Sequence, residues 1–156
     1  MSAVSEADLL RVRESRHMDD AQLLEAFEAC TLPFEEWTHR SHLRVAYLYA
    51  SRFPYVEALN RMRASIKAYN KATDTPEELD RGYHETITVA FMRLVTQAIG
   101  ERGPFASSQE FYEACAPALK KGVLLDYYSK GRLITLEAKQ GFVEPDLQPL
   151  PPQPVD

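Results

Sequence analysis

Two histidines stand three residues apart in the stretch EEWTHRSHLRVAYLYASRF, which covers residues 35–53. Helical residues with this spacing lie on the same side, with Cβ atoms roughly 5–6 Å apart, so His39 and His42 can reach a single metal ion. Both lie beside the apolar stripe of the expected helix, where a histidine must satisfy both of its ring nitrogens. Metal ligation by one nitrogen and a hydrogen bond from the other would satisfy both.

A third histidine, His84, lies in the stretch YHETITVAF. Three imidazoles from two helices of a bundle can form the open three-ligand site of catalytic zinc and of some non-haem iron enzymes. The sequence therefore predicts that His39, His42 and His84 bind one divalent metal, either zinc or iron. Glu85 is the expected acid/base group or fourth ligand, and Tyr83 is the tyrosine expected to line the pocket.

Basic side chains near the histidines point to anion binding as a second possible role. Arg40 and Arg44 lie on the helix face beside the histidines, and Lys130 and Arg132 follow in a late loop. Guanidinium and ammonium groups of this kind can hold an anionic substrate. The alternative is that they are solvated surface charges, as most such side chains are.

Each histidine also has a structural interpretation that needs no metal. His39 can cap the first helical turn together with Thr38, and His42 can hydrogen-bond to a backbone carbonyl. His84 can pair with a nearby glutamate. The sequence does not decide between these interpretations and ligation, because it does not show whether the two histidine-bearing helices are neighbours.

The elements that would position these residues are helical nearly throughout, because apolar residues recur at helical spacing. The expected helices cover 21–30, capped by Asp19 or Asp20, then 37–52, 54–72 and 107–116, with short apolar segments at 123–129 and 132–139 that are helical or irregular. A capping box predicts a further helix starting at Thr75 and running through Gly82. Alternatively, Gly82 breaks this run and the helix starts near His84.

No segment alternates with period two, so the sequence predicts a single-domain, all-α bundle of four to six helices. We expect a charged N-terminal segment over residues 1–18 and a helical domain over residues 19–142. An extended proline-rich tail is expected over residues 143–156.

Composition and charge narrow the possible partners. The formal net charge of −5 argues against nonspecific nucleic-acid binding, which needs a basic surface. No apolar run reaches the roughly 18 residues of a membrane span, and no secretory signal is visible, so a cytoplasmic location is expected. Nothing in the sequence indicates the oligomeric state.

The stretch LPFEEWTHRSHLRVAYLY, followed by YHETIT and PDLQPLP, resembles an uncharacterised family of small bacterial proteins with W-T-H-x-x-H-L and Y-H-E-T-x-T motifs. The resemblance covers roughly residues 20–150. It implies no reaction, but it implies that function concentrates at the motif residues: Trp37, Thr38, His39, His42, His84, Glu85 and Thr86. The architecture is also loosely similar to the DinB/YfiT-like bundles, which bind a metal through three histidines at a different spacing.

Two functional hypotheses follow. The first is a metal-dependent enzyme, with hydrolysis favoured over a non-haem iron oxygenase because nothing in the sequence demands redox chemistry. The second is a non-catalytic helical module with structural histidines. It would bind a small anion or a protein partner through Arg40, Arg44 and neighbouring aromatic residues.

Overall fold

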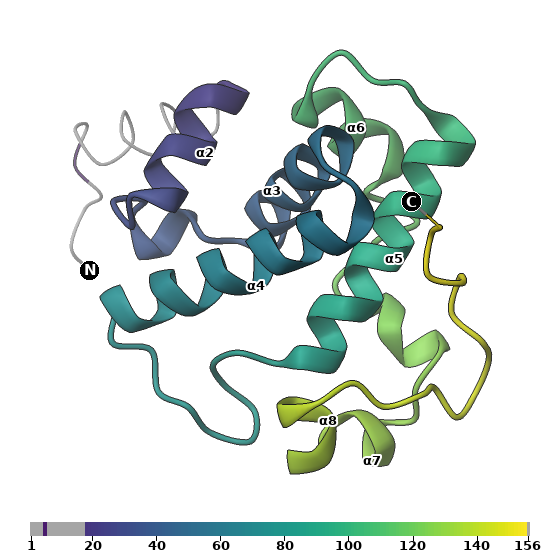
Figure 1. The fold of residues 1–156 in the computed structure, drawn as a ribbon. Helices are drawn as coiled ribbons and strands as arrows, with labels where there is room; N and C mark the ends of the chain where they lie inside the picture. The colour runs from purple at the N-terminus through teal and green to yellow at the C-terminus, as the bar shows by residue number, and fades with distance from the viewer. Residues whose placement is uncertain (1–4, 6–17, 156) are drawn as a thin grey trace.

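The computed structural model describes Ser5 and residues 18–155, and this part of the chain is helical without any strand (Figure 1). One isolated bridge between Glu78 and Arg81 is the only strand-like pairing in it. The predicted all-α, single-domain class is therefore confirmed. Apart from Ser5 and Met18, the charged segment expected over residues 1–18 lies outside the described residues.

Five helices of two turns or more form the body of the described chain: α2 (Asp20–Glu28), α3 (His39–Arg52), α4 (Tyr55–Ala72), α5 (Glu85–Arg102) and α6 (Ser108–Cys115). The shorter elements are the 3₁₀ turns η1 (Phe34–Glu36) and η2 (Val123–Asp126) and the helices α7 (Lys130–Leu133) and α8 (Leu136–Gln140). In Figure 1, α4 crosses in front of α3, and α7 and α8 lie together at the lower end of the view. No described helix is long and apolar enough to cross a membrane.

Side-chain caps set the starts of α2, α3 and α6, each within two residues of the predicted start. Asp19 accepts a hydrogen bond from the Gln22 backbone N–H, and the Gln22 side chain accepts one from Asp19 in return, which completes a capping box for α2. Thr38 caps α3 by accepting from the Ser41 N–H, and Ser107 caps α6. Each cap satisfies an N–H group that has no partner inside its own helix.

The helix start predicted at Thr75 is wrong, and the alternative break at Gly82 is correct. Gly82 has a φ of +87°, in the left-handed region that glycine adopts without a steric penalty. The Glu77 carboxylate accepts the Tyr83 N–H and holds the loop in this conformation. α5 then begins after His84, which acts as its N-cap.

Helix α3 is the centre of the molecule. Seven consecutive residues, 43–49, are buried, so the helix is covered on all sides along this stretch. It contacts α2, α4, α5 and α6. Only one of the seven is charged: Arg44, whose exposed fraction is 3%.

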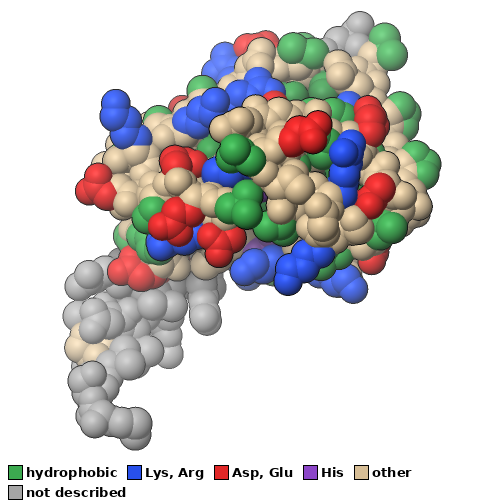
Figure 2. Space-filling view, turned by 90° about the horizontal axis from the view of Figure 1, so that it is seen from below, with side chains coloured by type: hydrophobic (Ala, Val, Ile, Leu, Met, Phe, Trp, Pro, Cys, Tyr) green, Lys and Arg blue, Asp and Glu red, His purple; other side chains and the backbone are tan. Residues whose placement is uncertain are grey.

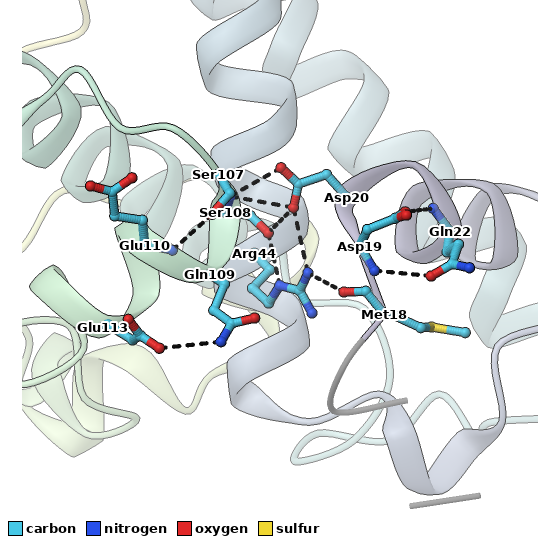
Figure 3. Close-up of polar contacts among 10 residues, drawn as sticks. All are labelled: Met18, Asp19, Asp20, Gln22, Arg44, Ser107, Ser108, Gln109, Glu110 and Glu113. Carbon is cyan, nitrogen blue, oxygen red and sulfur yellow. Dashed lines mark hydrogen bonds and ion pairs between the residues drawn. The ribbon is translucent and has the colours of Figure 1, made fainter. Parts of the chain in front are cut away.

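Arg44 joins three helices through hydrogen bonds and an ion pair (Figure 3). Its Nε donates to Ser108 Oγ at 2.8 Å, and one terminal nitrogen donates to the Met18 carbonyl at 2.7 Å and lies 3.4 Å from the Asp20 carboxylate. Asp20 in turn accepts the Ser108 N–H at 3.1 Å. The guanidinium therefore ties the start of α2 and the start of α6 to the central helix.

Removing this guanidinium should destabilise the fold strongly. Arg44→Met should lower the free energy of unfolding by about 3 kcal/mol, because it leaves the Asp20 carboxylate partly buried without its cation. Urea unfolding followed by circular dichroism measures the change. The matched control is Arg52→Met at the exposed end of α3, which should change the free energy by less than about 0.5 kcal/mol. Equal losses in the two variants would contradict a structural role for Arg44.

The C-terminal segment, residues 142–155, contains no helix or strand. Val143 and Leu150 are buried, and the Thr86 hydroxyl of α5 donates to the Gly141 carbonyl at 3.0 Å and accepts the Val143 N–H at 3.1 Å. These contacts attach the start of the segment to α5. The extended conformation expected for the tail stays a prediction.

Candidate functional site

A cavity of about 610 Å³ opens beside the first turn of α3. Its walls come from α3, α4, the first turns of α5, and the segment from Lys121 to Ile134. The volume lies within the roughly 300–1,000 Å³ typical of small-molecule pockets. Most of the lining is apolar and includes Leu43, Met62, Ile66, Phe91, Leu124 and Leu133.

The polar part of the lining is small and specific. It consists of two threonines, two histidines and two lysines: Thr38, Thr88, His39, His42, Lys121 and Lys130. No aspartate or glutamate is among the lining residues. An apolar wall with a few polar groups is the usual composition of a site that binds an organic molecule.

The two lining histidines each donate one ring N–H to a backbone carbonyl. His39 Nε2 lies 2.7 Å from the Leu119 oxygen, and His42 Nδ1 lies 2.7 Å from the Thr38 oxygen. A carbonyl oxygen only accepts, so these nitrogens carry protons, and in the neutral ring the other two, His39 Nδ1 and His42 Nε2, carry lone pairs. Neither of these lone-pair nitrogens has a hydrogen-bond partner among the described residues. Two residues of the cavity wall therefore each have one unpaired acceptor nitrogen.

His42 is held neutral by its surroundings. Its ring stacks on Trp37 with centroids 3.6 Å apart, and Trp37 stacks on Phe27 at 4.1 Å. Burial lowers the pKa of His42 to about 4, and the positive potential of His39 and Lys121 adds to this effect. At neutral pH the ring is therefore a hydrogen-bond acceptor and carries no charge.

His84 lies apart from this pair and does not line the cavity. As N-cap of α5, its Nδ1 accepts the Ile87 N–H at 3.1 Å, and its Nε2–H donates to the Leu133 carbonyl at 3.0 Å. Both ring nitrogens are therefore already engaged. Within the described part of the chain, no group of three or more His, Cys, Asp or Glu side chains is placed to hold a metal ion. The three-histidine metal site stays a prediction, and this arrangement does not support it.

Glu85, the expected acid/base group, and Tyr83, the tyrosine expected to line the pocket, form a separate cluster outside the cavity lining. Arg63 donates to both Glu85 oxygens, at 2.8 and 2.7 Å, and Tyr83 O–H donates to the same carboxylate. The hydrogen bonds from Arg63 lower the pKa of Glu85, and burial raises the pKa of Tyr83 to about 12. Both groups are thus fixed in an ion-pair network that joins α4 to the start of α5.

The two arginines expected to bind substrate also lie away from the cavity lining. The Arg40 guanidinium lies 4.9 Å from the centre of the Tyr112 ring, and Arg44 belongs to the buried network that joins α2, α3 and α6. The cationic groups at the cavity are Lys130, whose anion-binding potential the sequence indicates, and Lys121, which the sequence analysis missed. The sequence feature that could have identified Lys121 is its position just before the apolar residues of η2.

Two of the histidine hydrogen bonds hold the outer wall of the cavity. His39 reaches the Leu119 carbonyl before η2, and His84 reaches the Leu133 carbonyl at the end of α7. The chain between these carbonyls supplies the lining residues Lys121, Leu124, Leu125 and Lys130. His39 and His84 therefore bind the same segment at its two ends.

Comparison with known proteins gives no match to a family model, a curated protein or a solved structure. The resemblance to the family of small bacterial proteins stays a prediction. The cavity and its chemistry are therefore the features that indicate a function.

The low pKa of His42 should make the fold less stable in mild acid. The unfolded histidine binds a proton below about pH 6.5, whereas the folded one binds it only near pH 4. The unfolded state thus binds more protons between these values, so stability is lost as the pH falls through this window. Between pH 7 and pH 5 the contribution of His42 should fall by about 1–2 kcal/mol.

Urea unfolding of the wild type and of His42→Gln at both pH values isolates this contribution, because glutamine does not titrate. The wild type should lose more stability than the variant between pH 7 and pH 5. Equal losses would show that His42 titrates normally in the folded protein.

Proposed function

We propose that this protein binds a small, mainly apolar organic molecule in the cavity between α3, α4, α5 and the segment from Lys121 to Ile134. The observation that carries the proposal is the cavity itself, about 610 Å³ in volume and lined mostly by aliphatic and aromatic side chains. Burying apolar ligand surface against such walls supplies about 25 cal/mol per Å². A few polar groups then fix the ligand's orientation.

The acceptor nitrogens of His39 and His42 are the groups suited to that role. Each ring is oriented by its own hydrogen bond to a carbonyl and retains a lone pair. A hydroxyl or amide N–H of the ligand can donate to these nitrogens. A ligand without a donor would leave them desolvated and unpaired, which costs about 1–3 kcal/mol for each buried group.

The chemistry of the lining favours binding over acid/base catalysis. A general base works best with a pKa near the working pH, and the pKa of His42 is lowered to about 4. No carboxylate lines the cavity, and the Glu85 carboxylate is paired with Arg63 elsewhere. The proposal is therefore closest to the non-catalytic helical module, with a small molecule as its ligand.

Filling the cavity should weaken binding strongly. Ala46 is a buried lining residue of α3, and Ala46→Met adds volume where the ligand would lie. We expect the wild type to bind the neutral dye N-phenyl-1-naphthylamine and the variant to bind it about tenfold more weakly or worse. The readout is the emission of Trp37, the only tryptophan of the chain and itself a lining residue.

Ser51→Met is the matched control, because it adds the same side chain to an exposed position of α3 away from the cavity. Circular dichroism verifies that both variants fold. A dye affinity that is unchanged by Ala46→Met, or no dye binding by the wild type, would contradict the proposal.

A second candidate is a metal ion held by the two cavity histidines. Metal-ligating histidines usually donate their other N–H to a carbonyl or carboxylate, and His39 and His42 both do so. Two imidazoles are an incomplete set, so water or a substrate would have to supply the remaining ligands. A bound divalent ion would polarise its water or substrate oxygen.

Elemental analysis tests this candidate on protein purified without a histidine tag. About one equivalent of zinc or iron is expected, lost in His42→Ala and retained in His84→Ala, because His84 uses both ring nitrogens within the fold. Loss in both variants would instead favour the three-histidine site. No bound metal, even after incubation with zinc and iron(II), would contradict both the two-histidine and the three-histidine metal site.

A further inference from the structure

The charge of the cavity lining is opposite to that of the whole chain. The chain has a formal net charge of −5, yet the lining contains Lys121 and Lys130 and no carboxylate. Both lysines are exposed, and neither forms an ion pair with a carboxylate of the described residues. Figure 2 shows a histidine side chain beside Lys and Arg side chains at one edge of the displayed face. The lysines thus provide unneutralised positive charge next to an apolar volume.

Two helix N-termini add to this positive potential. Thr38, His39 and His42 come from the cap and first turn of α3, and Ile87 and Thr88 come from the first turn of α5. The N-terminus of a helix carries a partial positive charge that falls off within the first turn. Both of these first turns lie in the cavity wall, so their N-terminal charges act on whatever the cavity holds.

The histidines do not offset this potential. An imidazole ring brings no negative charge, and Lys121 lies near enough to His42 to contribute to the lowering of its pKa. Lys121 and the acceptor nitrogen of His42 therefore belong to the same region of the wall. An apolar volume with a cationic rim is complementary to an amphipathic anion.

On the basis of the proposed function, we infer that the ligand is an amphipathic carboxylate. Its alkyl or aryl part lies against the apolar walls, and its carboxylate lies at the rim near Lys121 and Lys130. An ammonium group is a point charge with three donors, well suited to a carboxylate that remains partly hydrated. A cationic amphiphile would meet like charge, and a neutral one would forgo the ion pairs.

The test compares sodium decanoate with decan-1-ol, which share an alkyl chain and differ in the head group. Both are titrated into the full chain below the micelle-forming concentration, with Trp37 emission as the readout. Decanoate should bind about fivefold or more tightly than decan-1-ol, as expected for ion pairs at a partly exposed rim. The preference should shrink in high salt, which screens these pairs.

Two variants test whether Lys121 and Lys130 cause the preference for decanoate over decan-1-ol. Lys121→Met combined with Lys130→Met should bring the decanoate affinity down to that of decan-1-ol, whereas Lys120→Met, an exposed neighbour outside the lining, should retain the preference. Equal binding of the two compounds by the wild type, or a preference that survives the double substitution, would overturn the carboxylate inference and leave cavity binding intact. Binding of neither compound, together with no binding of the neutral dye, would overturn the proposed function itself.

Discussion

Hydrogen bonds from histidine N–H groups to backbone carbonyls are the constraint on which the cavity depends. His39 and His84 lie on different helices, and they hold Leu119 and Leu133 respectively. The segment between these residues contains only single turns of helix, which are marginal in isolation. Its position over the cavity derives from these two anchors, from the packing of η2 against α5, and from hydrogen bonds of Tyr128 and Ser129 to the C-terminal segment.

The same hydrogen bonds determine what the histidines can do chemically. A ring that donates to a carbonyl has a fixed tautomer, so its second nitrogen is an acceptor. For His84 that acceptor is used by the Ile87 N–H, whereas His39 and His42 line the cavity and their acceptors have no partner among the described residues. Three histidines that look equivalent in sequence thus have two different roles. His84 uses both ring nitrogens to hold parts of the fold together. His39 and His42 hold backbone carbonyls and also line the cavity.

The sequence predicts the helices well, because caps and apolar periodicity are local. Thr38 and Ser107 stand next to the turns that they cap, and the break at Gly82 is one of two readings that local chemistry allows. The site is less predictable, because its decisive partners are distant. The Arg44 partner Ser108 lies 64 positions away, and the carbonyl that binds His39 lies 80 positions away. Any residue supplies a carbonyl, so no residue type marks these partners in the sequence.

Because both anchors of the outer wall end on main-chain oxygens, the wall can change its side chains without losing its attachments. Substitutions at the exposed residues Leu125 or Lys121 would alter the shape and charge of the cavity while His39 and His84 still bind the same backbone positions. The attachment of the segment and the shape of the cavity are thereby assigned to different atoms of one segment. The exposed positions of such a segment can change by point mutation, so the cavity can vary in shape and charge without rebuilding the helical core.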